Sequence, residues 1–266
     1  MAMNKIDQQL EVIKKEKRMG LMTHVVVGYP SITETIEIVK AMAQAGIDFV
    51  ELQIPFSDPL ADGPTIMRAC EESLANGTKV KDAFIVMKEL STQVTIPLLF
   101  MSYYNIVFRY GVEKFCRDAK RAGVSGLIVP DMPLDEEQYE HFYQSAKKYH
   151  LHTIQVVSPA STDARLKKNA AIANGFIYCT ARQGITGSQK DLDPAIRSYL
   201  KNVKKYFSIP VAVGFGISNK EHVASLKNEA DIAIVGSAVI DVIAQSSPKD
   251  RLQKITDFIS SLKMLK

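Results

Sequence analysis

Short apolar runs rich in β-branched residues alternate along the chain with longer amphipathic segments. Eight of these runs have the length and composition of buried strands, at 22–27, 49–54, 97–101, 126–129, 153–157, 176–179, 210–213 and 231–235. The segments between them have helical periodicity, at 31–45, 112–122, 134–149, 164–173, 196–206 and 219–226. We also expect a leading helix at 5–18 and two helices within 65–94. The order along the chain is therefore strand, helix, strand throughout.

This order predicts the fold class. Nearly continuous apolar strands indicate a sheet that is buried on both faces, and strands that alternate with helices indicate parallel pairing through right-handed crossovers. Eight such units are typical of a closed (β/α)8 TIM barrel. An open doubly wound sheet is the alternative, but no GxGxxG motif opens a first helix. We predict an α/β protein with a single TIM-barrel domain over residues 1–266, an extra N-terminal helix and additional short helices.

Composition and charge exclude several classes of protein. Of the 266 residues, 46% are hydrophobic and 23% are charged, which is typical of an ordered globular domain. The net charge of +4 and the short basic runs give no reason to expect nucleic-acid binding. No run approaches the roughly 20 apolar residues that span a bilayer, so we expect no membrane association and a cytoplasmic location. The five histidines lack metal-ligand spacing and the three cysteines form no paired framework, so we expect no metal site and reduced thiols.

A carboxylate stands inside the second predicted strand. Glu51 lies among apolar neighbours, where it would lose several kcal/mol of hydration unless it were paired, protonated or used in chemistry. Glu51 and Asp62 could form an acid/base pair. Alternatively, Glu51 is a satisfied structural charge and Asp62 is a helix N-cap ahead of Pro64. Asp58 precedes Pro59, a pattern more typical of a residue that shapes a turn or touches a partner.

Glycines follow the seventh and eighth predicted strands. In a TIM barrel the active site lies at the carboxyl ends of the strands. Gly214, Gly216 and Gly236 precede predicted helix starts, where backbone N–H groups and the helix dipole favour a phosphate. Ordinary tight turns are the alternative reading. The loop at 182–190 has no apolar anchors and could be a mobile lid or a plain surface turn.

The groups that are missing also constrain the chemistry. No lysine ends a predicted strand to form a Schiff base, and no ligand cluster could hold a metal that polarises a carbonyl. Carbon–carbon cleavage at this site would therefore need a substrate that carries its own electron sink.

Several longer motifs stand at these same positions. Residues 51–64 read ELQIPFSDPLADGP, residues 101–105 read MSYYN and residues 178–187 read YCTARQGITG, with GFGIS at 214–218 and GSA at 236–238. Together they closely resemble the signatures of the tryptophan synthase alpha subunit family, and the resemblance runs from about residue 20 to residue 244.

The resemblance implies a reaction. Members of this family reversibly cleave indole-3-glycerol phosphate to indole and glyceraldehyde 3-phosphate, as the alpha component in the last steps of L-tryptophan biosynthesis. Indole protonated at C3 would be the electron sink. By the family's roles, Glu51 would move protons at C3 and at the glycerol hydroxyl, and Asp62 would bind the indole N–H and stabilise developing positive charge.

The resemblance also implies further contacts. The family's beta subunit carries pyridoxal phosphate, so no cofactor is expected in this chain, and an alpha2-beta2 assembly is expected in which Asp58 and the loop containing Arg182 transmit signals. Thr186 would meet Asp62 when that loop closes. The expected pocket and phosphate contacts are Tyr178, Tyr103, Ile66, Thr186, Gly187, Phe215, Gly216, Gly236 and Ser237.

Three positions depart from the family pattern. Gln53 replaces a usual glycine, Ala181 replaces a usual serine, and His24 stands where phenylalanine is frequent. His24 would be either a polar, titratable wall of the pocket or a buried, hydrogen-bonded histidine. These departures motivate one alternative, a weakly catalytic barrel that acts mainly as an allosteric activator of the beta subunit. A sugar-phosphate isomerase of similar shape, which would keep the phosphate cradle, is a further alternative.

Overall fold

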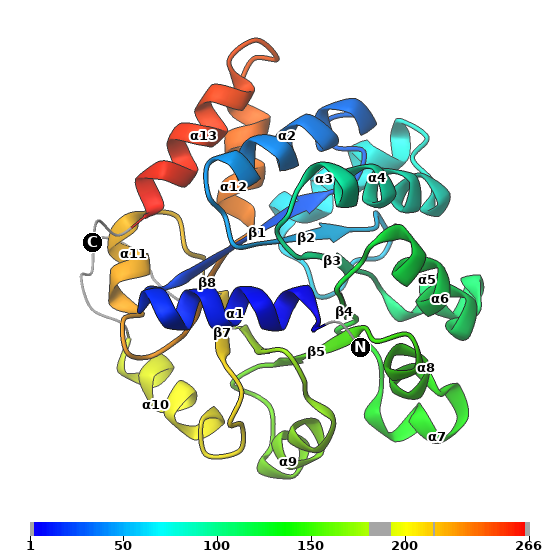
Figure 1. Cartoon of the computed structure of the whole chain (residues 1–266), viewed down its shortest axis with the longest axis vertical. Coiled ribbons are helices and arrows are strands. Elements are labelled where there is room, and N and C mark those ends of the chain that lie inside the picture. Colours follow the sequence, from blue (N-terminus) through cyan, green and yellow to red (C-terminus); the bar gives the residue numbers. More distant parts are fainter. Residues whose placement is uncertain (1–2, 181–192, 215, 264–266) are drawn as a thin grey trace.

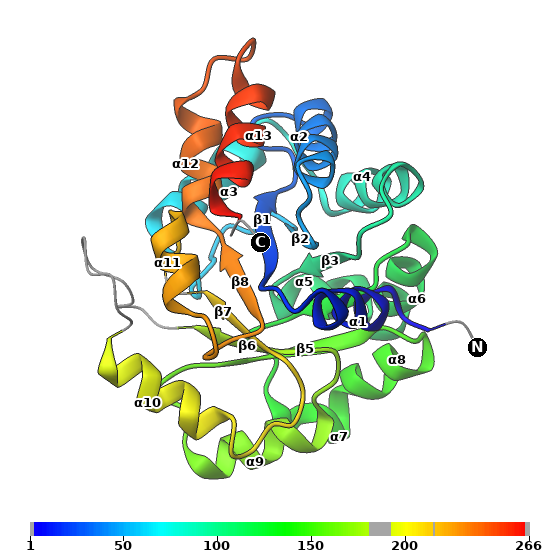
Figure 2. The same cartoon turned by 60° about the vertical axis from the view of Figure 1, so that its left-hand side comes forward.

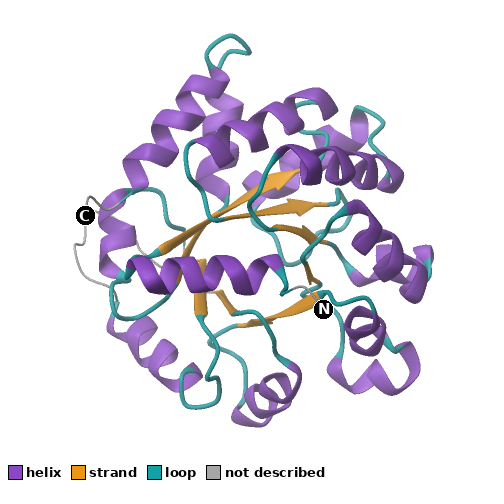
Figure 3. Cartoon of the chain, viewed as in Figure 1, coloured by secondary structure: helices purple, strands orange, loops and turns teal. Residues whose placement is uncertain are grey.

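The eight predicted strands close into a barrel. The computed structural model describes residues 3–180, 193–214 and 216–263, and within them the strands pair in parallel in chain order, with β8 returning to β1. The predicted TIM barrel is therefore confirmed, with helices surrounding the strands (Figure 3). The strands are β1 (Gly20–Val26), β2 (Phe49–Gln53), β3 (Leu98–Met101), β4 (Gly126–Ile128), β5 (His152–Val157), β6 (Ile177–Thr180), β7 (Val211–Gly214) and β8 (Ile232–Val235).

The helices cover the outside of the barrel (Figures 1 and 2). The leading helix is present, and the region 65–94 contains two helices, as expected. Two further helices, α5 and α13, were not predicted from the sequence. The helices are α1 (Lys5–Glu16), α2 (Ile32–Gln44), α3 (Pro64–Ala75), α4 (Val80–Gln93), α5 (Tyr104–Tyr110), α6 (Val112–Ala122), η1 (Leu134–Glu136), α7 (Glu137–Glu140), α8 (Phe142–Lys148), α9 (Asp163–Ile172), α10 (Pro194–Val203), α11 (Lys220–Ser225), α12 (Ser237–Gln245) and α13 (Arg251–Leu262).

The helix expected at 134–149 is broken. His141 adopts a left-handed backbone conformation with φ of 54°, which ends α7 and starts α8. The Glu137 carboxylate accepts hydrogen bonds from the backbone N–H groups of Tyr143 and Gln144, both at 2.9 Å. A side chain thus satisfies amide donors that a continuous helix would have paired internally, and this local competition breaks the helix.

Helix α1 closes the amino-terminal end of the barrel (Figures 1 and 2). Ile6 and Ile13 are buried and belong to the apolar cluster inside the strands. Two glycines make room for them: a Cβ on Gly126 would lie 2.8 Å from Ile6 Cδ1, and one on Gly20 would lie 2.7 Å from Ile13 Cδ1. A side chain at either strand start would therefore require the neighbouring isoleucine of α1 to shift.

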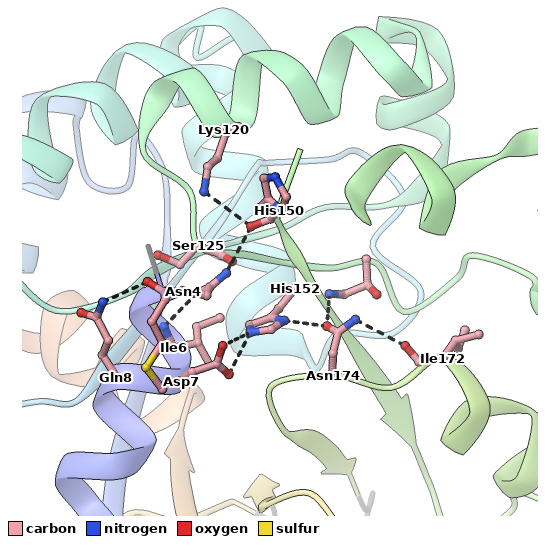
Figure 4. Close-up of polar contacts among 12 residues, drawn as sticks. Asn4, Ile6, Asp7, Gln8, Lys120, Ser125, His150, His152, Ile172 and Asn174 are labelled. Carbon is pink, nitrogen blue, oxygen red and sulfur yellow. Dashed lines mark hydrogen bonds and ion pairs between the residues drawn. The ribbon is translucent and has the colours of Figure 1, made fainter. Parts of the chain in front are cut away.

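Polar contacts anchor the start of α1 to distant loops (Figure 4). The Asn4 side chain accepts from the backbone N–H of Ile6 and donates to the carbonyls of Ser125, at 2.9 Å, and His150, at 3.2 Å. The Asp7 carboxylate lies 2.9 Å from Nε2 of His152 on β5. These bonds fix the helix across the mouth of the barrel.

Alternation along the strands decides what fills the interior. Phe49 and Phe176 meet inside the barrel with ring centroids 5.7 Å apart. Because successive strand residues point to opposite faces, the residues two positions further along, Glu51 and Tyr178, also point inward. The same periodicity that builds the apolar core therefore brings these polar side chains to the carboxyl end of the barrel.

Candidate active site

A cavity of about 100 Å³ lies at the carboxyl ends of the strands. It contains both predicted catalytic carboxylates and three of the predicted binding positions. A larger cavity, of about 1150 Å³, lies near the start of α1 and contains none of the predicted site residues. The smaller cavity is lined by His24, Glu51, Ala61, Asp62, Ile66, Met101, Ile128, Pro130, Val156, Tyr178, Thr180 and Gly236.

Glu51 is buried in β2, with a side chain that is 3% exposed. Its register partner on β1 is His24, and Glu51 Oε1 lies 2.6 Å from His24 Nδ1. The second carboxylate oxygen, Oε2, is buried and has no hydrogen-bond partner among the described residues. Glu51 is thus only half satisfied as a structural charge, and its free oxygen belongs to a side chain that lines the cavity.

The pKa of the His24 imidazole is higher than that of an ordinary histidine. Burial lowers the pKa of its imidazole, but the neighbouring charges of Glu51 and Asp62 and the Gln53 side chain outweigh burial and raise that pKa above 6.5. His24 Nε2 has no hydrogen-bond partner among the described residues. The His24–Glu51 pair therefore retains a proton within the cavity wall at pH 6.5.

Asp62 is held by side-chain donors in the loop between β2 and α3. Gln53 Nε2 donates to Asp62 Oδ2 at 2.6 Å, and the Tyr103 hydroxyl donates to the same oxygen at 3.0 Å. The N-cap of α3 is Gly63, which makes no side-chain capping bond, and Pro64 begins the helix. The alternative that Asp62 serves as a helix N-cap is therefore wrong.

Tyr103 holds the loop between β2 and α3 through its hydroxyl and its ring. Its hydroxyl also accepts from the backbone N–H of Ala61 at 3.0 Å, and its ring stacks on Phe56 with centroids 5.3 Å apart. Burial, followed by the charge of Asp62, raises the pKa of the Tyr103 hydroxyl well above 10, so it stays a donor. The sequence predicts Tyr103 as an apolar wall of the pocket, but the cavity lining does not include it.

Tyr178 enters the cavity from β6, next to β7. A Cβ on Gly214 would lie 3.3 Å from both Cε1 and the hydroxyl of Tyr178, so the glycine leaves room for the ring. Burial, followed by the charges of Glu51 and Asp62, raises the pKa of Tyr178 well above 10. Tyr178 therefore presents a neutral ring and hydroxyl to whatever the cavity holds.

The predicted phosphate positions are described only in part. Gly236 precedes α12, Ser237 is the first residue of that helix, and Gly216 has a φ of 73° after β7. Ile66, predicted as a pocket residue, lines the cavity from α3.

Asp58, predicted as a partner contact, is exposed in the β2–α3 loop and accepts a hydrogen bond from the Ser57 hydroxyl at 2.5 Å. The predictions for Ala181, Arg182, Thr186, Gly187 and Phe215 lie outside the described residues.

Sequence reasoning did not predict the partners of the two carboxylates. It left His24 open as a titratable pocket wall or a buried, hydrogen-bonded histidine without naming a partner, and it noted Gln53 only as a bulky polar neighbour of Glu51. A signal was present for Gln53, since a polar residue two positions after Glu51 shares its strand face. No comparable signal pairs His24 with Glu51, because that contact depends on the register between two strands.

In the part of the chain that the structure describes, no group of three or more His, Cys, Asp or Glu side chains is placed to hold a metal ion. No helix within those residues is long and apolar enough to cross a membrane.

The fold and the cavity define a class of protein. A TIM barrel with two carboxylates and a neutral tyrosine at the carboxyl ends of its strands is a barrel enzyme equipped for acid/base chemistry. The family model described as "Tryptophan synthase alpha chain" matches residues 10–266. The chain belongs to the tryptophan synthase alpha chain family. It is a carbon–carbon lyase of tryptophan biosynthesis, a class that excludes the sugar-phosphate isomerase alternative.

Relatives in this family align with nearly the whole length of the chain. The tryptophan synthase alpha chain of Desulfotalea psychrophila is 45% identical over 97% of this chain and 99% of its own. The alpha chain of a Thermoanaerobacter species is 41% identical over 98% of this chain and 99% of its own. Among solved structures, subunit alpha from Legionella pneumophila has a TM-score of 0.88 at 30% identity, covering 98% of this chain and 97% of that chain.

Proposed function

We propose that Glu51 and Asp62 perform, in this chain, the reversible cleavage of indole-3-glycerol phosphate to indole and glyceraldehyde 3-phosphate. One observation carries this assignment: both carboxylates line one cavity at the carboxyl ends of the strands, and Glu51 keeps a buried oxygen without a partner among the described residues. An unpaired carboxylate oxygen is costly to bury, so its presence at a cavity is typical of a group that exchanges protons with a ligand.

The cleavage requires one proton to enter and one to leave. Glu51 delivers a proton to indole C3, and the resulting ring system has a C2–N double bond that accepts electrons. The hydroxyl on the adjacent glycerol carbon then loses its proton to Glu51 as its carbonyl forms and the carbon–carbon bond breaks. The released electron pair forms the C2–C3 double bond of indole, while the C2–N pair returns to nitrogen. Asp62 accepts the indole N–H and stabilises the positive charge that develops there.

The cavity lining and the family resemblance support the rest of the proposed pocket. Tyr178 and Ile66 provide apolar surface for an indole ring, and Gly216, Gly236 and Ser237 offer backbone N–H groups to the phosphate. Gly187 and Phe215 would complete the phosphate site, with Thr186 closing on Asp62. Tyr103 contributes by holding Asp62 rather than by touching the ligand.

The two described departures from the family pattern support catalysis. His24 and Gln53 each hydrogen-bond one of the proposed catalytic carboxylates, at 2.6 Å in both cases. Contacts of this kind position reacting groups, which argues against a barrel that acts mainly as an allosteric activator.

The proposal extends to partners and location. We place this chain with a beta chain that carries pyridoxal phosphate and consumes the indole, in an alpha2-beta2 assembly in the cytoplasm. Asp58, which is exposed in the β2–α3 loop, and Arg182 are the proposed links to that partner.

Removing either carboxylate tests the assignment. We expect Glu51→Gln and Asp62→Asn each to lower kcat by about 100-fold or more, since positioned acid/base groups contribute about 10²–10⁴-fold. Release of glyceraldehyde 3-phosphate, coupled to its NAD-dependent oxidation with the beta chain present, measures the cleavage. Gln155→Met is the matched control, because Gln155 is a buried glutamine on β5 whose amide nitrogen donates to the Thr153 carbonyl and which does not line the cavity. Wild-type rates in either carboxylate variant would refute the roles.

A further inference from the structure

The His24 imidazole is buried beside Glu51 and takes no part in the cleavage steps. His24 lies directly across from Glu51 in the β1–β2 register, and both side chains are almost fully buried. His24 Nδ1 lies 2.6 Å from Glu51 Oε1, whereas Glu51 Oε2 and His24 Nε2 have no hydrogen-bond partner among the described residues.

We propose that His24 is a positioning residue for Glu51: its Nδ1–H fixes Oε1, so that Oε2 is left as the atom that exchanges protons with substrate. The inference rests on the proposed function of Glu51. A carboxylate in an apolar strand can rotate about its terminal torsion, and a single donor on one oxygen removes that freedom. The fixed oxygen is Oε1, and the oxygen that remains available is Oε2.

The charges around His24 favour its protonated form. Glu51 and Asp62 are the carboxylates that face it, Tyr178 is neutral, and no lysine or arginine lines the cavity among the described residues. The pKa of His24 is raised above its ordinary 6.5, because these carboxylates and Gln53 outweigh the effect of burial. His24 therefore carries its proton below its raised pKa and loses it as the pH rises through that value.

This titration predicts how the cleavage depends on pH. With His24 protonated, its Nδ1–H donates to Glu51 Oε1 in a charge-assisted hydrogen bond, which holds the carboxylate more firmly than a neutral donor does. Above the raised pKa the donor is a neutral imidazole and the bond is weaker, so kcat falls on the alkaline side. The raised histidine pKa moves this limb to higher pH than an ordinary imidazole would give, and a lowered pKa would move it to lower pH.

Two substitutions separate hydrogen bonding from titration. His24→Asn keeps an amide donor near the position of Nδ1 but cannot titrate, whereas His24→Phe removes the donor. We expect His24→Phe to lower kcat by about tenfold or more with KM within about threefold, which is the loss of one hydrogen bond to a charged group. We expect His24→Asn to recover kcat to within about threefold of wild type and to lose the alkaline limb that His24 contributes.

Three kinetic results would overturn the inference. They are a wild-type kcat and pH profile in His24→Phe, an equal loss of kcat in both variants, or an effect on KM alone, which would mark His24 as a wall for the ligand. The Glu51→Gln and His24→Phe variants together show whether the role of His24 or the proposed function of Glu51 has failed. If Glu51→Gln is inactive while His24→Phe is normal, only the inference fails, whereas an active Glu51→Gln refutes the function itself.

A measurement on the wild-type protein keeps the proposal testable if His24→Phe does not fold. In ¹⁵N-histidine-labelled protein, the signal that disappears in His24→Asn belongs to His24. We expect this imidazole to titrate above 6.5, with Nδ1 protonated in its neutral form, and to titrate at lower pH in Glu51→Gln. A titration unchanged by Glu51→Gln would show that the two groups are not coupled and would overturn the proposal.

Discussion

Replacing Gln53 with methionine should separate catalysis from stability. Gln53 is fully buried on β2, and its amide nitrogen donates to Asp62 Oδ2 at 2.6 Å. Its amide oxygen is buried without a hydrogen-bond partner among the described residues. Methionine has nearly the same length and volume but neither polar atom, so Gln53→Met removes one favourable and one unfavourable contribution together.

These two contributions largely cancel in the free energy of unfolding. A hydrogen bond to a charged group stabilises by about 1.5–3 kcal/mol, and a buried unsatisfied polar atom costs about 1–3 kcal/mol. We therefore expect the free energy of unfolding to change by less than about 1 kcal/mol. Catalysis has no such compensation, because among the described residues Asp62 keeps only the Tyr103 hydroxyl as a side-chain donor. Since Asp62 is partly exposed, we take the lower end of the range, which corresponds to about a tenfold loss in kcat/KM.

Urea unfolding and the coupled cleavage assay measure the two quantities separately. Gln155→Met is again the control, since it removes a buried amide from the same barrel without touching either carboxylate. The reasoning is refuted if Gln53→Met loses more than about 2 kcal/mol of stability while kcat/KM stays at the wild-type value. That result would make Gln53 a packing residue.

Two further predictions concern stability and reactivity. Asn4→Ala should lower the free energy of unfolding by about 1–2 kcal/mol, because it removes the N-cap of α1 and two long-range hydrogen bonds. The cleavage rate should stay unchanged. An unaltered midpoint of urea unfolding would contradict this prediction. Burial raises the pKa of the Cys70, Cys116 and Cys179 thiols to about 12 in each case. A thiol-reactive disulfide should therefore label none of the three at pH 8 until urea unfolds the chain. Rapid labelling of the native protein would refute their burial.

The barrel could be predicted from the sequence because its strands are buried on both faces. Their apolar runs are continuous, so their existence and order did not depend on any long-range contact. The helix at 134–149 could not be predicted correctly, since its apolar periodicity continues through His141. Only the side chain of Glu137, which caps the following helix, explains the break.

The candidate site was predictable in its carboxylates and not in their partners. Glu51 stood out because a charge in an apolar strand is costly, whatever the strand pairs with. The contact with His24 depends on the β1–β2 register, which hydrophobicity specifies weakly when both faces of a strand are apolar. The Gln53–Asp62 bond depends on the path of a loop, and no periodic pattern encodes that path.

The closure of the barrel by α1 has a consequence for the order of folding. Asn4 bonds to carbonyls that lie 121 and 146 residues further along the chain, and Asp7 reaches His152, 145 residues away. During synthesis the first helix is made well before the strands that receive it, so it cannot dock until more than half of the chain has left the ribosome. Contacts of such long separation slow folding and leave the apolar face of the helix exposed in the meantime. Helix α1 is therefore made before the elements that receive it and is among the last to reach its final place.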